Sequence, residues 1–192
     1  TCTKKNNERW RTRYRMIVKL IQNLIRFLFL VAIQVVVLNH IQWSGYVNPY
    51  VYILFLLLLP VETPKALQLV LGLVTGLVID MFGNTSGLHA AASVFLMFAR
   101  PGILRLIAPR DGYDAEVRLI PQVMGLNWFL TYAGILTFLH HLLYFYLEVF
   151  RFTEFGMTFL KLVINSAVSL LLIVMGTYLF IRSGKSNERI LG

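Results

Sequence analysis

The chain has 192 residues, of which 57% are hydrophobic and 14% are charged, and its formal net charge is +9. This composition excludes an ordinary soluble domain and indicates an integral membrane protein. The positive charge would also suit a nucleic-acid partner, but the aromatic residues lie inside apolar runs and not along a basic face, so we expect no nucleic acid. The single cysteine, Cys2, excludes an internal disulfide and a cysteine-based metal site.

The first segment of the chain is strongly basic. Seven cationic side chains precede the first apolar run: Lys4, Lys5, Arg9, Arg11, Arg13, Arg15 and Lys19. Such a segment does not cross a bilayer and is attracted to anionic lipid headgroups, so it predicts a cytoplasmic N-terminus. Met16 stands just before the apolar run. If the protein begins there, residues 1–15 are an upstream basic extension of a polytopic membrane domain covering residues 16–192.

Six apolar runs then follow one another. They are Leu20–Leu38, Tyr50–Leu59, Ala66–Phe82, Leu88–Leu106, Val123–Val149 and Met157–Ile181. Because a membrane-spanning helix needs about 20 residues, these runs predict an all-α integral membrane protein, a single bundle of about six transmembrane helices. The run Tyr50–Leu59 is short and lies between Pro49 and Pro60, so a half-spanning or kinked element is the alternative there.

The placement of charge agrees with six crossings. Fifteen of the 18 Lys and Arg then fall on the cytoplasmic side, and the loops Asn39–Asn48 and Gly83–Gly87 contain none. This is the pattern expected when an even number of spans leaves both termini in the cytoplasm. Arg26 lies within the first run, where we expect it to extend to the headgroups and act as a membrane anchor.

The fourth run is followed by a polar interruption. Arg100-Pro101-Gly102 is expected to break the helix, after which Leu104, Arg105 and Ile107 would form a short helix at the membrane interface. The loop Ala108–Pro121 then carries a turn signature at Asp111-Gly112.

The third run carries a small-residue face that ends in a carboxylate. Gly72, Gly76 and Asp80 are spaced four residues apart, so they share one helix face on which a second helix can approach closely. A carboxylate near a membrane boundary is costly unless it is paired, hydrated or protonated. Asp80 is therefore either a proton or ligand site, or a structural group. In the second case it would pair with a basic side chain or cap the following turn through Asn84, Thr85 and Ser86.

The histidines do not suggest a metal site. His89 has no further zinc ligands nearby, so we expect it to be buried beside Asp80 or Asn84. His140 and His141 are adjacent and point to different helix faces; one is expected to face the bundle and the other a cavity or partner. Catalytic patterns such as G-x-S-x-G, H-E-x-x-H and the P-loop are absent from the sequence, so no catalytic residue, cofactor or metal is predicted. In the last run, Asn165, Ser166 and Ser169 are expected to form interhelical hydrogen bonds.

One stretch of the chain resembles a known family. It reads N-P-Y-V-Y-I-L-F-L-L-L-L-P, then G-L-V-T-G-L-V-I-D-M-F-G-N-T-S-G-L-H-A-A, then P-R-D-G-Y. These motifs resemble the MreD family of rod shape-determining proteins, in the form found in Bacteroidetes-like bacteria. The part of the pattern shared broadly in that family is G-x-x-x-G-x-x-x-D followed by G-L-H, here Gly72, Gly76, Asp80, Gly87, Leu88 and His89.

The resemblance implies a non-enzymatic scaffold or regulatory subunit of the cell-elongation complex in the cytoplasmic (inner) membrane. Its implied partners are the bitopic protein MreC and, indirectly, MreB and the RodA–transpeptidase synthase of peptidoglycan. The implied fold is similar to the substrate-binding subunits of energy-coupling-factor vitamin transporters. We expect the MreC span to pack along the first spans and the Gly72–Gly76 face.

Two other functions remain open. A small-molecule uptake subunit would need a polar cavity on the outer side, lined by Asp80, Asn84, His89 and Trp43. An intramembrane enzyme would need Asp80 to work with His89 or with a histidine of the 140–141 pair.

Overall fold

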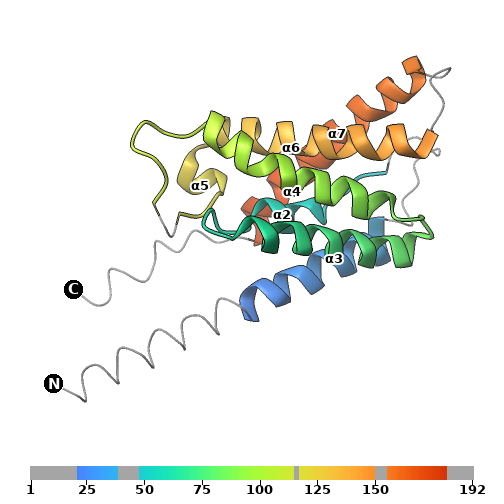
Figure 1. Cartoon of the computed structure of the whole chain (residues 1–192), viewed down its shortest axis with the longest axis horizontal. Helices are drawn as coiled ribbons and strands as arrows, with labels where there is room; N and C mark the ends of the chain where they lie inside the picture. Colours follow the sequence, from blue (N-terminus) through green and yellow to red (C-terminus); the bar gives the residue numbers. More distant parts are fainter. Residues whose placement is uncertain (1–20, 39–47, 115–116, 150–154, 181–192) are drawn as a thin grey trace.

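A computed structural model of the chain describes residues 21–38, 48–114, 117–149 and 155–180, and every regular element in these ranges is helical (Figure 1). The first helix, Ile21–Val37, ends in the π-helical turn η1 (Ile33–Val37). The others are α2 (Ile53–Leu57), α3 (Lys65–Gly83), α4 (Leu88–Leu106), α5 (Pro121–Met124), α6 (Leu126–Val149) and α7 (Phe155–Phe180). The all-α class predicted from the apolar runs is thereby confirmed for these residues.

Three helices are long and apolar enough to cross a membrane. They are α3, α6 and the part of α7 from Gly156 to Leu179, whereas Ile21–Val37 is apolar but shorter. A chain with three such helices is a membrane protein by length and composition. Helix length alone does not establish the six crossings expected from the sequence.

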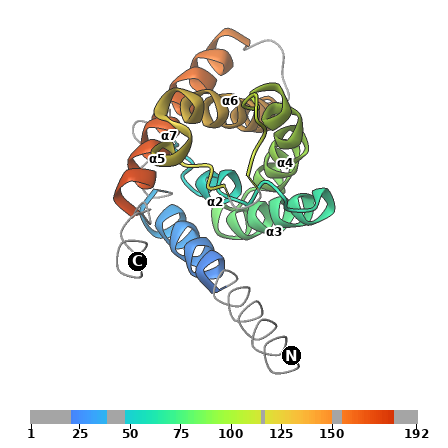
Figure 2. The ribbon, with the colours of Figure 1, turned by 90° about the vertical axis from the view of Figure 1, so that its left-hand side faces the viewer.

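The second apolar run forms the centre of the bundle and not a long helix. Residues 48–52 are irregular, the five-residue α2 follows, and none of the residues from Tyr50 to Leu57 is more than 8% exposed. Seen along the bundle, α2 lies inside a ring formed by α3, α4, α6 and α7 (Figure 2). The run therefore has the form of the alternative given above, a kinked or half-spanning element, and not of one continuous helix.

Helix α4 corrects one expectation. It continues from Leu88 through Pro101 to Leu106, so the predicted break at Arg100-Pro101-Gly102 and the separate interface helix after it are wrong. Proline removes one backbone hydrogen bond from a helix interior. Here the flanking residues Arg100 and Leu104 are both buried, and their packing holds this end of α4 on the bundle.

Helices α3 and α4 form a hairpin whose backbones touch at the two glycines. A Cβ atom added at Gly76 would lie 2.3 Å from the Ala90 Cα, and one added at Gly72 would lie 2.9 Å from the Ser93 carbonyl oxygen. The small-residue face is therefore filled by α4 of the same chain. The expectation that a partner span packs on the Gly72–Gly76 face is wrong for this reason.

We predict that Gly76→Ala destabilises the protein by about 3 kcal/mol, because the new methyl group must push apart two helix backbones. The matched control is Gly102→Ala, since nothing lies within 4 Å of a Cβ at that helical position. That variant should gain about 0.5 kcal/mol from the lower entropy of its unfolded chain. Thermal unfolding in detergent measures both, and equal melting temperatures would contradict the close contact.

Candidate functional site

Asp80 lies where α3 ends and the chain turns back into α4. Asn84 caps α3 in the left-handed conformation (φ 52°), and Gly87, with φ 83°, stands at the N-cap position of α4. Both positions suit a turn, because asparagine tolerates positive φ and glycine adopts it without steric cost. This turn brings the first backbone amides of α4 directly against the Asp80 side chain.

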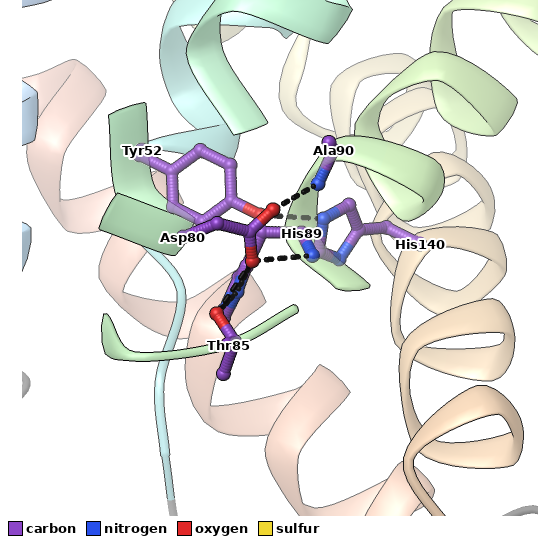
Figure 3. A network of polar contacts seen from close by, with 6 residues as sticks. All are labelled: Tyr52, Asp80, Thr85, His89, Ala90 and His140. Carbon is purple, nitrogen blue, oxygen red and sulfur yellow. Dashed lines mark hydrogen bonds and ion pairs between the residues drawn. The ribbon is translucent and has the colours of Figure 1, made fainter. Parts of the chain in front are cut away.

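The Asp80 carboxylate accepts hydrogen bonds from two backbone amides and two side chains (Figure 3). Its Oδ1 lies 2.5 Å from the Thr85 hydroxyl and 3.1 Å from both the amide nitrogen and Nδ1 of His89. Its Oδ2 accepts from the Ala90 amide at 3.0 Å. Gly87 has no side chain with which to cap α4, so Asp80 supplies the cap from the preceding helix.

The predicted neighbours of Asp80 are only partly brought together. Thr85 and His89 contact the carboxylate, whereas Asn84 and Ser86 are exposed on the turn. Trp43, the remaining residue of the expected outer cavity, lies outside the described residues. The predicted structural role of Asp80 is therefore correct as to its bond with Thr85 of the turn. In addition, the carboxylate caps the start of α4.

The His89 ring is not arranged as the base of a catalytic relay. Its Nδ1 faces both Asp80 Oδ1 and the Thr85 hydroxyl, each at 3.1 Å. In a nucleophile–histidine–carboxylate relay the nucleophile and the carboxylate bind opposite ring nitrogens. The geometry is therefore that of a hydrogen-bonded structural group, with Thr85 and Asp80 competing for one imidazole nitrogen.

Beside this group, phenol and imidazole rings pack in the bundle interior. The Tyr50 ring lies 4.9 Å from His89 and 5.1 Å from His141 between centroids, and His89 lies 4.6 Å from Tyr144. The Tyr52 hydroxyl is 2.7 Å from His140 Nε2 (Figure 3). Rings from two helices, α4 and α6, and from residues 48–59, called the central segment below, therefore form one cluster that the sequence did not predict.

Both members of the histidine pair point into the protein. His140 contacts Tyr52, and His141 Nε2 lies 3.2 Å from the Ser169 hydroxyl of α7. Neither is exposed, so neither faces a partner at the surface of the bundle. The reason is that the central segment and α7 cover the two neighbouring faces of α6 at this level.

Side chains satisfy the backbone of the irregular residues before α2. Gln34, in η1, donates from Nε2 to the Pro49 carbonyl at 3.1 Å and accepts from the Val51 amide at 2.8 Å. On the other side, Ser169 accepts from the Tyr50 amide at 2.9 Å. A non-helical backbone inside a membrane protein needs such partners because lipid provides none.

Asn165 does the same one turn of α7 earlier, where its Oδ1 accepts from the Asn48 amide. Ser169 makes the expected interhelical bond, to His141 of α6, in addition to its bond to the Tyr50 amide. Asn165 bonds to the central segment, and the buried Ser166 hydroxyl has no partner among the described residues.

Arg100 forms a second buried polar group at the opposite end of the central segment. Its Nη2 donates to the Leu59 carbonyl, its Nε donates to the Tyr132 hydroxyl at 2.8 Å, and that hydroxyl donates to the Leu57 carbonyl at 2.9 Å. The Arg100 side chain is fully buried. The charge pattern of the sequence places Arg100 among the cytoplasmic loop charges, which is wrong. Its spacing of four residues from the apolar Leu96 and Leu104 indicates instead that it lies on the buried face of α4.

Arg26 is half-buried on the first helix, and no described hydrogen bond joins it to either polar group. Within the described ranges, no cluster of three or more His, Cys, Asp or Glu side chains is placed to hold a metal ion. The site therefore consists of hydrogen-bonded groups that hold helices together.

Comparison with known proteins does not assign a family. No protein-family model, curated protein or solved structure matches the chain.

We predict that Asp80→Asn destabilises the protein by about 2–4 kcal/mol. The amide group places a donor where a carboxylate oxygen now accepts, so at least one buried amide of α4 loses its partner. The control is Asp111→Asn, an identical change at an exposed loop position. Unfolding in detergent measures the difference, and equal stability of the two variants would refute the capping role.

We also predict that Arg100→Met destabilises the protein by about 3 kcal/mol, because the Leu59 carbonyl and the Tyr132 hydroxyl lose a buried donor. Arg105→Met, five residues later on the exposed face of α4, should change stability by less than about 0.5 kcal/mol. Similar losses in both variants would show that the positive charge matters at this end of the helix and the buried contacts do not.

Proposed function

We propose that the chain is a non-enzymatic membrane scaffold or regulatory subunit of the bacterial cell-elongation complex, acting with MreC and through it on peptidoglycan synthesis. One observation supports this most. The residues that carry the resemblance to the MreD family meet at a single joint, where Gly72 and Gly76 touch α4 and Asp80 binds the start of α4 at His89. The broadly shared motif is thus used to build the fold.

The same joint is a poor substrate site. The Asp80 carboxylate already accepts four hydrogen bonds, and Nδ1 of His89 faces Asp80 and Thr85. A substrate would have to displace internal partners from a buried carboxylate, which costs more than binding to a prepared site. This favours a structural role over intramembrane catalysis or uptake through Asp80.

The proposal includes six crossings with both termini in the cytoplasm, in an architecture similar to the substrate-binding subunits of energy-coupling-factor transporters. The central segment supports this count. It runs antiparallel to α6: the Tyr50 ring lies beside that of Tyr144, and the Leu57 carbonyl accepts a hydrogen bond from Tyr132, twelve residues earlier on α6. Twelve residues of helix rise about 18 Å, so the segment extends through much of a hydrocarbon core about 30 Å thick.

Charge supports the orientation. The Leu59 end of the central segment adjoins Arg100. Four further cations belong to this end of the bundle: Lys65 at the start of α3, Arg105 at the end of α4, and Arg110 and Arg118 in the loop that follows α4. Cations concentrate on the cytoplasmic side of membrane proteins. We therefore assign this end to the cytoplasm and the Asp80–His89 end to the outer face.

The partner surface in this proposal is the outward face of the first helix. Leu24, Ile25 and Leu28 are exposed there, at positions that share one side of the helix. The Gly72–Gly76 face is filled by α4, so the first helix is what remains of the surface expected to receive the MreC span.

Native mass spectrometry of the protein, extracted gently from its own membranes, tests the function. We expect a bound single-span protein and no stoichiometric small molecule. A retained small molecule, or an ATPase module in place of the single-span protein, would contradict the scaffold and favour uptake.

Photo-crosslinking locates the partner. A photoreactive residue at Ile25, which is 61% exposed on the first helix, should crosslink to the single-span protein. The control position is Phe98, which is 71% exposed on α4. Figure 2 shows α4 on the side of the bundle away from the first helix, so no crosslink is expected there. Equal crosslinking at both positions would rule out a specific site on the first helix.

A further inference from the structure

Two arginines from distant parts of the chain come together at one end of the bundle. Arg26 lies near the start of the first helix, and Arg118 lies in the loop between α4 and α5. Their guanidinium groups are close enough for the two charges to repel each other. Figure 1 shows the start of the first helix and α5 at the same end of the bundle. The fold therefore holds two like charges together, which is unfavourable unless an anion joins them.

The described part of the chain does not supply that anion. The ion pair found in these ranges joins Asp80 to His89, and the same ranges provide no carboxylate partner for Arg26 or Arg118. Arg26 is half-buried, so water solvates its charge less well than that of an open surface residue. Arg118 is exposed and can contact a group outside the protein. The pair thus has both the unbalanced charge and the access that an external anion needs.

Arg26 stands at the border between the packed and the outward sides of the first helix. One turn further along, Phe29 is exposed whereas Leu30 is buried in the core. Ala32 and Val36, three and seven residues beyond Phe29, are exposed as well, so the outward side continues along the helix. An anion bound to Arg26 is therefore placed to extend an apolar chain over this side.

Polar side chains precede Arg26 on the same side of the helix. Gln22 and Asn23 stand four and three residues before it, which places them next to Arg26 on a helix surface. Their amide groups donate hydrogen bonds, and a guanidinium binds two phosphate oxygens at once through its planar fork. The first helix thus presents donors for a phosphate group, followed by an apolar surface.

We propose that Arg26 and Arg118 form a binding site for the phosphate of an anionic phospholipid, whose acyl chain lies along Phe29 and Val36. The phosphate neutralises both guanidinium groups and so links the first helix to the loop before α5. Anionic lipids are plentiful in the cytoplasmic leaflet, on the side where the cations of membrane proteins concentrate. The site rests on the orientation proposed above and not on the elongation function.

Lipid titration of the purified full chain in detergent, followed by native mass spectrometry, tests the site. The probes are phosphatidylglycerol, which is anionic, and phosphatidylcholine with the same acyl chains, which is zwitterionic. We expect one phosphatidylglycerol to bind at least ~10-fold more tightly than phosphatidylcholine, because it leaves no second cation at the two guanidinium groups. Equal affinity for the two lipids would overturn the proposal. A phospholipid is recognised by its mass and is not the water-soluble substrate that uptake requires.

Replacing both arginines tests the assignment to these residues. Arg26→Gln with Arg118→Gln should weaken phosphatidylglycerol binding ~30-fold, since each cation at a membrane surface contributes about fivefold. The matched control is Arg105→Gln with Arg110→Gln, which removes the same charge from exposed positions in the same region. It should weaken binding by less than about twofold. Equal weakening in the two double variants would show that only net charge matters, which overturns the proposal.

Two further measurements keep the test decisive. Arg118→Gln alone changes an exposed loop residue that the fold does not bury, and it should still weaken phosphatidylglycerol binding about fivefold; an unchanged affinity would contradict the site. Inorganic phosphate at the same concentration as the lipid should not displace it, because phosphate has no acyl chain to lie along the helix. Displacement by phosphate would assign the arginines to a free anion and overturn the lipid site.

Discussion

The capping of α4 by the Asp80 carboxylate is the interaction on which the rest of the site depends. A helix begins with amides that have no partner in the helix itself, and a glycine at the N-cap cannot satisfy them. Asp80 reaches them because Gly76 lets α3 and α4 touch one turn earlier. The same carboxylate also fixes the His89 ring, which then packs against Tyr50 of the central segment. The close approach of α3 and α4 at Gly76 and the position of the Asp80 carboxylate therefore depend on each other.

At the other end of the central segment, Arg100 likewise satisfies a buried backbone group, but with a cationic side chain. The carbonyls of Leu57 and Leu59 lie at and just beyond the end of α2, before Pro60, which has no amide hydrogen to donate. The Arg100 guanidinium supplies several donors in a fixed plane: one binds the Leu59 carbonyl and another the Tyr132 hydroxyl, which in turn binds the Leu57 carbonyl. Asp80 thus binds the first amides of a helix, whereas Arg100 binds a carbonyl just beyond the end of one, and the two side chains form no ion pair with each other.

Much of this arrangement could be predicted from the sequence. Length and hydropathy identified α3, α6 and α7, and the four-residue spacing of Gly72, Gly76 and Asp80 identified the packed face. The burial of Arg100 and the continuity of α4 through Pro101 were missed, because the groups that hold Arg100 come from positions 32 and 41 residues away in the chain. Local patterns describe a helix face, but they do not say which distant segment covers it.

The central segment shows why that limit is physical. Its irregular residues have a backbone that no helix of their own satisfies, so their position depends on Gln34 on one side and on Asn165 and Ser169 on the other. In the sequence, each of these side chains is one polar residue in an apolar helix, and nothing near it indicates its partner. Only when the segment is inserted among the helices do they acquire backbone groups to bind. Gln34, Asn165 and Ser169 are thus best understood as the hydrogen-bond partners of one buried, irregular stretch of chain.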